Sequence, residues 1–527
     1  MKKFLALGML SFLSGIAFAQ GAAEPIMISD ATARKISIDG KWIGCHGMTI
    51  LIYNLETGES ETYPNCSLGI GNCMAIDGTT VGSYNDLSVL MRNGEVQLQR
   101  NLINNGFNGI NGITPDGTKV VGFVKNPDLI GVDASDVYDM GIPVYLPFYA
   151  ELGATGSIED INVLPVPEKD FLGLAPQKVT GEWISEDGKI ILGTITDSYG
   201  RFEDPIVYHL GENGEWSYIL PTKEFNNPNG IVLPENPEDK MPPEPVYKDY
   251  MGAVEYEAYL EALQDYFYGG GPEVDPFEFM TDEEIEKYLK DYEAYVNYFE
   301  DHREEFRAYE AAYREILATS KFFGESALDP LGKILATSAV DYDTEDSYGN
   351  SQIFIIDALS GEYKEIKSKF SGLKIHQVLS DGTVIAYSGL FTYEPLQGYI
   401  LLPGEDDFMP FANYLSATNT YYYDWLETTF PYGEGIISAS DDLAVVAGGV
   451  DILHVEDYDE YPDVTLLSYV FPDMKSAGVE AIELPVEDGV YRVYNLVGVK
   501  VLETKEKSEL NKLAKGIYII NGKKISI

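Results

Sequence analysis

A short phrase that returns along the chain constrains the fold more than any other feature of the sequence. Each copy has an apolar residue, a small polar residue and an Asp-Gly pair, followed by β-branched residues that alternate toward Gly or Ala. Asp hydrogen-bonds within its own turn and Gly accepts a positive φ, so the pair predicts a tight turn leading into a strand. The seven turns lie at Asp39-Gly40, Asp77-Gly78, Asp116-Gly117, Asp187-Gly188, Gly332, Asp381-Gly382 and Asp441-Asp442.

The spacing of these phrases indicates one four-stranded unit per copy. The first two intervals are 38 and 39 residues, and two hairpin turns in about 40 residues give four antiparallel strands, the blade of a β-propeller. We therefore predict a mainly β chain with a propeller of about seven blades over residues 20–475. A pair of β-sandwiches with chance Asp-Gly turns is the alternative. The second turn signals are Thr57-Gly58, Asn93-Gly94, Asn213-Gly214 and Ser360-Gly361.

The repeated phrase resembles the blade repeats of bacterial extracellular and periplasmic propellers of the HAF-type and TolB-like families. This resemblance covers residues 30–470 and rests on short motifs. It implies the fold and not an activity, because propellers serve both as binding scaffolds and as enzymes. Propellers of six or eight blades remain alternatives.

A long insertion separates the fourth phrase from the fifth. Residues 222–245 are rich in Pro and Asn and predict a linker. Apolar residues then follow helical spacing over 253–267, and Thr281 and Glu284 form a capping-box sequence before a second helix of about 35 residues. We expect these helices to form an antiparallel hairpin, inserted at 236–321, that stands off the propeller.

The second predicted helix carries an unbroken aromatic stripe on a strongly acidic background. Residues 244–319 hold 21 acidic and six basic side chains. In the simpler interpretation, the stripe packs against the shorter helix and the propeller. In the other, the longer helix outruns its partner, and the exposed part of the stripe suits protein or glycan recognition. The candidate recognition residues are Tyr288, Tyr292, Tyr295, Phe299, Phe306 and Tyr309.

The N-terminus predicts export through the Sec pathway. Lys2 and Lys3 precede an apolar stretch, and Ala17-Phe18-Ala19 is a small-x-small cleavage site, so residues 1–19 form a signal peptide. A short transmembrane anchor is the alternative, but the apolar run is short for a membrane span. No later segment has 18 uninterrupted apolar residues, so no transmembrane segment is expected in the mature chain.

The last fifty residues differ from the body in the sign of their charge. The whole chain has 36 basic and 85 acidic side chains, a formal net charge of −49, whereas residues 490–527 have eight basic and three acidic ones. Alternating apolar residues predict a small antiparallel β-domain over 478–527, after a linker at 476–488. Its stretches "VYNLVGVKV" and "LNKLAKGIYIINGKK" are similar to the type A C-terminal sorting domain of type IX (Por) secretion cargo of Bacteroidetes.

This resemblance implies a route for the protein. It implies Sec export, recognition of the tail by the outer-membrane secretion machinery, and then secretion or attachment at the cell surface. Without a type IX system the protein would stay periplasmic. Many family members have Pro where this chain has Ala514, which is a minor departure. The matching positions are Val493, Tyr494, Asn495, Leu496, Gly498, Leu513, Lys515, Gly516, Tyr518, Gly522 and Lys523.

No catalytic motif stands out in the sequence. The chain lacks a G-x-S-x-G elbow, an H-E-x-x-H metal site and a P-loop, and its five His residues are scattered. Carboxylates are so numerous that no two can be singled out as a glycosidase pair. Asp341, Asp343 and Glu345 are weak candidates for a Ca²⁺ site, although a solvated loop explains them as well. No other cofactor is expected.

Three cysteines, Cys45, Cys66 and Cys73, lie within 29 residues. In an exported chain, Cys66 or Cys45 can pair with Cys73, which leaves one thiol over. The spacing fits no zinc pattern, and buried free thiols are the alternative.

These observations favour a binding function. The acidic charge repels nucleic acid and disfavours it as a partner. We predict a non-catalytic propeller scaffold, exported or at the cell surface, that binds a polymer or protein through its loops and insertion. The alternatives are a secreted hydrolase or lyase acting on a glycan or peptide, and a structural surface-layer component. An enzyme would gather polar residues on the propeller axis, whereas an apolar axis would favour the scaffold.

Overall fold

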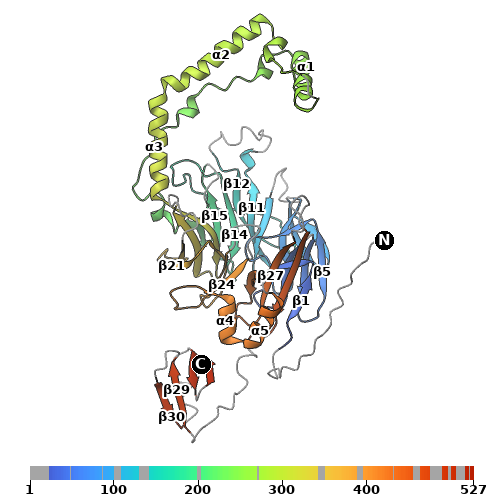
Figure 1. Cartoon of the computed structure of the whole chain (residues 1–527), viewed down its shortest axis with the longest axis vertical. Helices are drawn as coiled ribbons and strands as arrows, with labels where there is room; N and C mark the ends of the chain where they lie inside the picture. The colour runs from blue at the N-terminus through green and yellow to red at the C-terminus, as the bar shows by residue number, and fades with distance from the viewer. Residues whose placement is uncertain are drawn as a thin grey trace, which may run out of the picture.

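The chain folds into a ring of β-sheets, a helical arm and a separate small sheet (Figure 1). Residues 1–19, the predicted signal peptide, lie outside the described residues. The computed structural model describes residues 23–99 apart from 48 and 86, 108–129, 142–198, 203–269, 272–341, 350–388, 396–430, 433–454, 463–474, 490–495, 500–505, 517–520 and 523–526.

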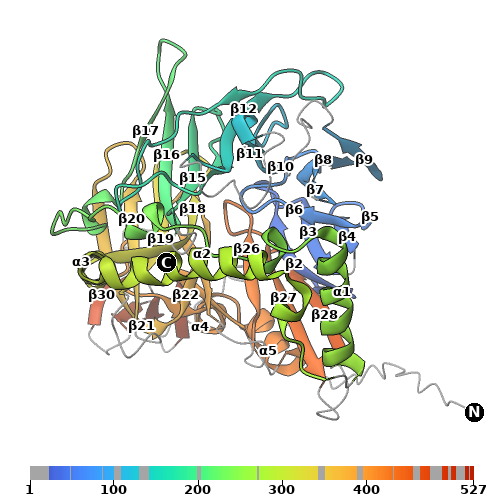
Figure 2. The ribbon, with the colours of Figure 1, turned by 90° about the horizontal axis from the view of Figure 1, so that it is seen from above.

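Seven antiparallel blades make up the ring in this described part of the chain (Figure 2). The prediction of a propeller of about seven blades is therefore confirmed. Blades 1 to 3 are β2 (Ala31–Ile36), β3 (Trp42–Gly47), β4 (Thr49–Asn54) and β5 (Ser60–Pro64); β6 (Cys66–Leu68), β7 (Thr80–Tyr84), β8 (Leu87–Arg92) and β9 (Glu95–Leu98); and β10 (Asn108–Ile113), β11 (Lys119–Lys125), β12 (Tyr145–Glu151) and β13 (Asn162–Val163), with the short turn η2 (Pro127–Leu129).

The other blades follow the same order, and a single parallel pair, Tyr145 with Lys178, joins blades 3 and 4. Blades 4 to 6 are β14 (Lys178–Ile184), β15 (Ile190–Thr196), β16 (Glu203–Leu210) and β17 (Trp216–Ile219); β18 (Lys321–Leu328), β19 (Ile334–Asp341), β20 (Asn350–Asp357) and β21 (Tyr363–Ser371); and β22 (Leu373–Val378), β23 (Val384–Ser388), β24 (Gln397–Leu401) and β25 (Met409–Pro410). Helices α4 (Phe411–Thr418) and α5 (Thr420–Thr429) lead to blade 7.

Blade 7 joins the two ends of the propeller. Its strands β26 (Ile436–Ala439), β27 (Val446–His454) and β28 (Asp463–Phe471) come from the end of the ring, and β1 (Ile26–Ser29) supplies the fourth strand. β1 runs antiparallel to β28, with Ile26 opposite Val470. The N-terminal strand therefore closes the ring.

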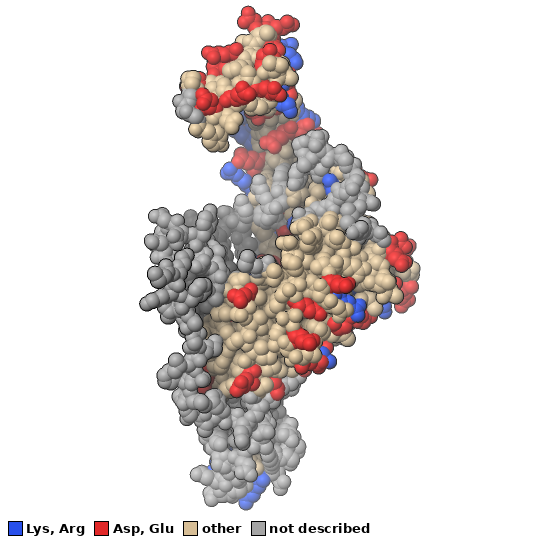
Figure 3. Space-filling view, turned by 90° about the vertical axis from the view of Figure 1, so that its right-hand side faces the viewer, with Lys and Arg blue, Asp and Glu red and all other residues tan. Residues whose placement is uncertain are grey.

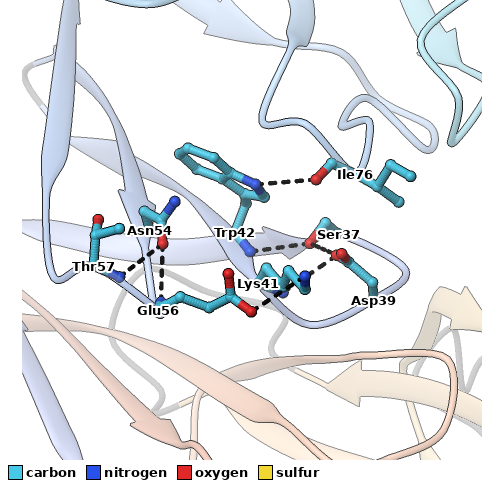
Figure 4. Close-up of polar contacts among 8 residues, drawn as sticks. All are labelled: Ser37, Asp39, Lys41, Trp42, Asn54, Glu56, Thr57 and Ile76. Carbon is cyan, nitrogen blue, oxygen red and sulfur yellow. Dashed lines mark hydrogen bonds and ion pairs between the residues drawn. The ribbon is translucent and has the colours of Figure 1, made fainter.

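The repeated phrase builds the turn between the first and second strands of each blade. Figure 4 shows this turn in blade 1. In blade 1, Ser37 Oγ donates to Asp39 Oδ1 at 2.8 Å, and the Trp42 amide donates to Ser37 Oγ at 3.0 Å. Gly40 has a φ of 73°, which suits Gly. Trp42 Nε1 also donates to the carbonyl of Ile76 at 3.1 Å, which fastens blade 1 to the turn of blade 2.

The Gly that follows the turn in several phrases is required by close packing of strands. A Cβ on Gly82 would lie 1.8 Å from the carbonyl oxygen of Ser67, and one on Gly122 would lie 1.9 Å from that of Gly109. Any larger residue would push the second strand away from the first. Apolar side chains fill the space between blades, as in the cluster of Val120, Phe148 and Ile158.

The arm is the insertion between β17 and β18. It begins with η4 (Lys223–Phe225), η5 (Pro237–Lys240) and η6 (Tyr247–Asp249), and continues with α1 (Ala253–Gln264), η7 (Asp265–Gly269), η8 (Pro276–Phe279), α2 (Asp282–Asp301) and α3 (Arg303–Thr319). The capping box is present: the Glu284 amide donates to Thr281 Oγ1 at 3.3 Å, and the Thr281 amide donates to Glu284 Oε2 at 2.8 Å.

Two details of the arm differ from the prediction. The long second helix divides at His302, whose Nδ1 and backbone amide both lie 3.0 Å from the Tyr298 carbonyl, so the side chain competes for a helical acceptor. The Pro-rich segment is not a free linker. Pro237 is buried, and its carbonyl accepts a hydrogen bond from the Tyr298 hydroxyl at 2.9 Å. Irregular chain thus packs along α2, where a hairpin of two helices was expected.

The C-terminal residues form the predicted small antiparallel sheet. Its strands are β29 (Tyr491–Asn495), β30 (Lys500–Thr504), β31 (Ile517–Ile520) and β32 (Lys523–Ser526), in the order β30-β29-β31-β32. Val493, opposite Ile520, is fully buried. No helix in the described part of the chain is long and apolar enough to cross a membrane.

Candidate functional site

A cavity of about 780 Å³ lies on the axis of the ring, and every one of the seven first strands contributes to its lining. It opens at the N-terminal ends of these strands. Helix α3 leads directly into the N-terminal end of β18, so the arm leaves the propeller from the same face. Figures 1 and 2 show α2 above the blades and across the ring.

Bulges in the inner strands place polar side chains in this cavity. The register of five inner strands shifts at one point, and the residues skipped by the shift are cavity-lining ones. A bulge leaves a residue unpaired and turns its side chain away from the ladder. The skipped residues that line the cavity are Arg34 in β2, Asn111 in β10, Glu182 in β14, Gly324 and Glu325 in β18, and His376 in β22.

Lys35, next to the first bulge, is a positive charge deep in the cavity. Its Nζ lies 4.8 Å from the centre of the Trp183 ring. No carboxylate of the described residues lies within ion-pair distance of it. Burial lowers the pKa of Lys35, although the charge of Glu182 partly opposes that shift. A cation in such surroundings favours an anionic partner.

Glu182 and His376 flank this lysine with opposite responses to burial. Burial raises the pKa of Glu182, whose Oε1 accepts a hydrogen bond from Thr180 Oγ1 at 3.1 Å. Burial, helped by the charge of Lys35, lowers the pKa of His376 to about 3. His376 is therefore neutral at pH 7. Its Nε2 donates to the Arg34 carbonyl at 2.9 Å, which leaves Nδ1 as an acceptor.

Two further lysines on the inner strands form ion pairs. Lys178 lies 3.2 Å from Glu203, and Lys374 lies 2.8 Å from Glu325. Both pairs are partly solvated, so each contributes little stability. Lys35 differs from these two lysines, because it forms no ion pair among the described residues and can interact with the charge of a ligand.

The axis narrows toward the Asp-Gly turns. A second hollow of about 60 Å³ there is lined mainly by apolar residues. The Asn72 side chain links two blades here: its Nδ2 donates to the Ile184 carbonyl at 2.8 Å, and its Oδ1 accepts from the Ile184 amide at 3.0 Å. The axis is therefore polar at its wide mouth and mainly apolar at its narrow end.

The aromatic stripe of the arm is divided between packing and exposure. Tyr288 is buried against Tyr247, with ring centres 4.8 Å apart. Tyr292 and Phe299 remain 45% and 39% exposed. Tyr295, Phe306 and Tyr309 are intermediate. Both interpretations of the stripe thus apply, each to different residues.

The other candidate residues are placed as follows. Asp341 ends β19, whereas Asp343 and Glu345 lie outside the described residues. Among the residues that the structure describes, no three His, Cys, Asp or Glu side chains are arranged to hold a metal ion. Cys45, Cys66 and Cys73 are buried free thiols, and burial raises their pKa values.

Five of the residues predicted to form a sorting signal fall within the described tail. Val493, Tyr494 and Asn495 lie in β29, Tyr518 in β31 and Lys523 in β32. The others lie outside the described residues: Leu496, Gly498, Leu513, Lys515, Gly516 and Gly522.

The axial residues escaped the sequence analysis, although a positional signal marks them. The residue five positions before the turn Asp is polar in five phrases and lines the axis in each. In four of these phrases the position lies on the inner strand, and in the second it follows the inner strand β6, so a polar residue there faces the axis. Those five residues are Arg34, Asn72, Asn111, Glu182 and His376.

Comparisons with known proteins find no match in sequence and a distant likeness in structure. No family model matches the chain, and no curated protein matches it. Solved structures match over most of its length. A prolyl endopeptidase has 10% identity and a TM-score of 0.37, covering 90% of this chain and 53% of its own, so this chain spans about half of that protein.

Two further solved structures complete the comparison. An oligogalacturonate lyase in complex with manganese has 10% identity and a TM-score of 0.42, covering 86% of this chain and 99% of its own. The β-propeller domain of the Trilobed protease from Pyrococcus furiosus has 10% identity and a TM-score of 0.33, covering 83% and 80%. Likeness at this level carries no argument about activity. The ring of seven blades in this chain is what assigns it to the β-propeller fold.

Proposed function

We propose that this protein binds a carboxylate-bearing polymer, an acidic glycan or an acidic peptide, in the axial cavity beneath the arm. One observation carries the proposal: bulged inner strands bring Arg34 and His376 to a cavity of about 780 Å³ that also contains Lys35. A cavity of this size accommodates a few residues of a polymer.

The charge distribution supports an anionic ligand. The chain has a formal net charge of −49, and Figure 3 shows acidic side chains spread over the arm and the visible blade surface, with fewer basic ones. Such a surface repels acidic polymers. Lys35 lies inside, over Trp183, and forms no ion pair with a carboxylate of the described residues. A ligand carboxylate would compensate that buried charge.

The exposed part of the arm supplies a second contact. Tyr292 and Phe299 present aromatic surface on α2. Aromatic rings stack on sugar rings and on peptide groups with little loss of side-chain entropy. We therefore assign the arm to the binding of the polymer beyond the cavity, as in the scaffold hypothesis.

Calorimetric titration of the chain without its predicted leader, residues 20–527, with three hexamers tests the binding proposal. The hexamers are hexagalacturonate, hexaglutamate and neutral maltohexaose. We expect binding of an acidic hexamer and not of the neutral one. A twin protein, with residues 236–315 replaced by a Gly-Ser linker, should bind more weakly through loss of the arm. Preference for maltohexaose, or no binding of either acidic hexamer, would contradict the proposal.

A second candidate function is acid–base catalysis at the same site. Burial raises the pKa of Glu182 and lowers that of Lys35, so both shifts are toward neutral pH, as in groups that exchange protons during catalysis. This favours a hydrolase or lyase acting on a glycan or peptide. Slow production of new chain ends from hexagalacturonate or hexaglutamate, abolished by Glu182→Gln, would replace the scaffold by an enzyme.

We also propose export and tail-directed sorting. The signal sequence at residues 1–19 and the sorting-domain resemblance at 478–527 support this route. The small sheet of β29–β32 supports a domain distinct from the propeller. Deletion of residues 490–527 should retain the protein in the periplasm of a host with a type IX system. Continued surface display of the truncated protein would contradict the proposal.

A further inference from the structure

A second cavity, remote from the axis, lies in blade 4 at the root of the arm. Its volume is about 630 Å³. Asp197 follows β15, Asp204 lies in β16, and Asp170 lies in the loop between β13 and β14. All three line the cavity, which therefore has acidic groups from three segments.

The acids lie inside the cavity and the lysines lie at its surface. Asp197 and Asp204 are 2% and 8% exposed, whereas the lining residues Lys169 and Lys223 are exposed. No ion pair joins either lysine to an acid among the described residues. Burial of several carboxylates around one space favours a proton or a cation between them, so the interior of this cavity favours positive charge.

Neutral groups of the lining also fit a cation. Thr222 lines the cavity and is 1% exposed, and its hydroxyl has no hydrogen-bond partner in the described part of the chain. Asn226 Nδ2 donates to Asp204 Oδ2 at 2.9 Å, which leaves its amide oxygen as an acceptor. Phe171 and Tyr218, both half-buried, add aromatic surface.

These features distinguish between two kinds of cation. A metal ion would need several converging acids, and no such group of three exists among the described residues. The cavity is also much larger than an ion and has aromatic walls, which attract organic cations. We infer that this cavity binds an alkylammonium group, from a free amine or from a lysine side chain. The inference does not depend on the proposed function of the axis.

Protons should compete with the ammonium group. Burial, with the charges of Asp197 and Asp170, raises the pKa of Asp204 to about 7. Burial also raises the pKa of Asp170, despite three backbone amides that donate to it. Glu168, Lys169 and Lys223 are the remaining charged groups of the lining. Ammonium affinity should therefore be about tenfold lower at pH 6 than at pH 8, because Asp204 is protonated at the lower pH.

Calorimetric titration of the chain without its predicted leader, residues 20–527, at pH 8 tests the inference with four probes. The probes are putrescine, Nα-acetyl-lysine methylamide, n-butanol as a neutral analogue, and CaCl₂. We expect binding of at least one of the two amines, no binding of butanol, and a tenfold loss of affinity at pH 6. Putrescine alone would indicate a free amine, and the lysine derivative a peptide. Binding of neither amine, equal binding of butanol, or binding of Ca²⁺ alone would overturn the inference.

Three variants locate the binding. Asp204→Asn should reduce amine affinity at least tenfold, and Thr222→Val should reduce it several-fold while the apo protein keeps its thermal stability. The control Asp160→Asn removes an exposed charge after β12 and should change neither property. Unchanged amine affinity in both Asp204→Asn and Thr222→Val would overturn the assignment to this cavity. If Asp204→Asn fails to fold, Thr222→Val alone decides.

Discussion

The axis and the arm are both candidate recognition surfaces, but they are built in different ways. Axial side chains project from bulges in hydrogen-bonded strands and are surrounded by other blades. The aromatic residues of the arm lie on a helix whose outer residues, such as Tyr292, are partly exposed to solvent. The axis thus fixes charged side chains in one geometry, whereas the arm exposes apolar surface. Specificity should reside in the axis and adaptable contact in the arm.

The largest expected effect is that of removing the axial cation. Lys35→Met keeps the length of the side chain over Trp183 and removes the charge that a ligand carboxylate would meet. Loss of one member of a buried charge pair costs about 2–5 kcal/mol. Calorimetry should therefore show at least about 30-fold weaker binding of the acidic hexamer. Lys364→Met, at an exposed ion pair with Asp406, is the control. Equal binding of the acidic hexamer by wild type, Lys35→Met and Lys364→Met would show that the axial lysine does not bind this ligand.

The pH dependence of the free energy of unfolding tests the burial of His376 in the axial cavity. The pKa of His376 is about 3 in the fold and about 6.5 in an unfolded chain, so only the unfolded chain takes up the proton between these values. Above pH 6.5, His376 is neutral in both states and the free energy of unfolding does not depend on its protonation. As pH falls below 6.5, protonation of His376 in the unfolded chain lowers the free energy of unfolding by up to about 1.4 kcal/mol per pH unit. Urea unfolding of His376→Gln should show a shallower loss between pH 6 and 4 than wild type.

The matched control for this experiment is His209→Gln, because His209 Nε2 also lies 2.9 Å from a carbonyl, that of Ala358. The shift of Asp204 acts in the opposite direction, since its raised pKa removes stability as pH rises from about 4 to 7. The Asp204 shift is the same in wild type, His376→Gln and His209→Gln, so it cancels when their pH slopes are compared. An identical pH slope for wild type and His376→Gln would show that His376 is not desolvated in solution.

A smaller effect is expected from truncating the exposed aromatic residues of the arm. The double variant Tyr292→Ala, Phe299→Ala should weaken polymer binding by about 1–2 kcal/mol, since each side chain is only partly buried by a ligand. The melting temperature of the propeller should not change. Tyr256→Ala on α1 is a control of similar size, half-buried near Tyr259. A loss as large as that of Lys35→Met would reverse the roles of arm and axis.

The smallest effect concerns the local stability of the arm. Thr281→Ala removes the N-cap of α2 and should cost about 1 kcal/mol there. Hydrogen exchange of residues 282–288 should accelerate severalfold, while exchange in the blades stays unchanged. Thr281→Ser retains the cap and is the control. Faster exchange in the blades of the Thr281→Ala protein would show that arm and ring unfold as one unit.

The sequence predicted the ring because its signals are local and repeated. Asp39-Gly40 and its counterparts mark each turn by their own hydrogen bonds and positive φ. The arm was predicted less completely, because the kink at His302 depends on a side chain competing for the Tyr298 carbonyl, which spacing does not reveal. The axial site was missed because Arg34, Glu182 and His376 are far apart along the chain, and only ring closure brings them together.

Closure of the ring by β1 has a consequence for how the protein comes apart. In a linear row of repeats, each unit contacts only its neighbours, and the end units open first. The pairing of Ile26 with Val470 turns the row into a cycle without ends, so fraying has no natural starting point. During folding, β28 must also pair with β1 from the opposite terminus, and such non-local pairing is slow. Strand β1, a few residues after the predicted leader, thus holds the two ends of the propeller together.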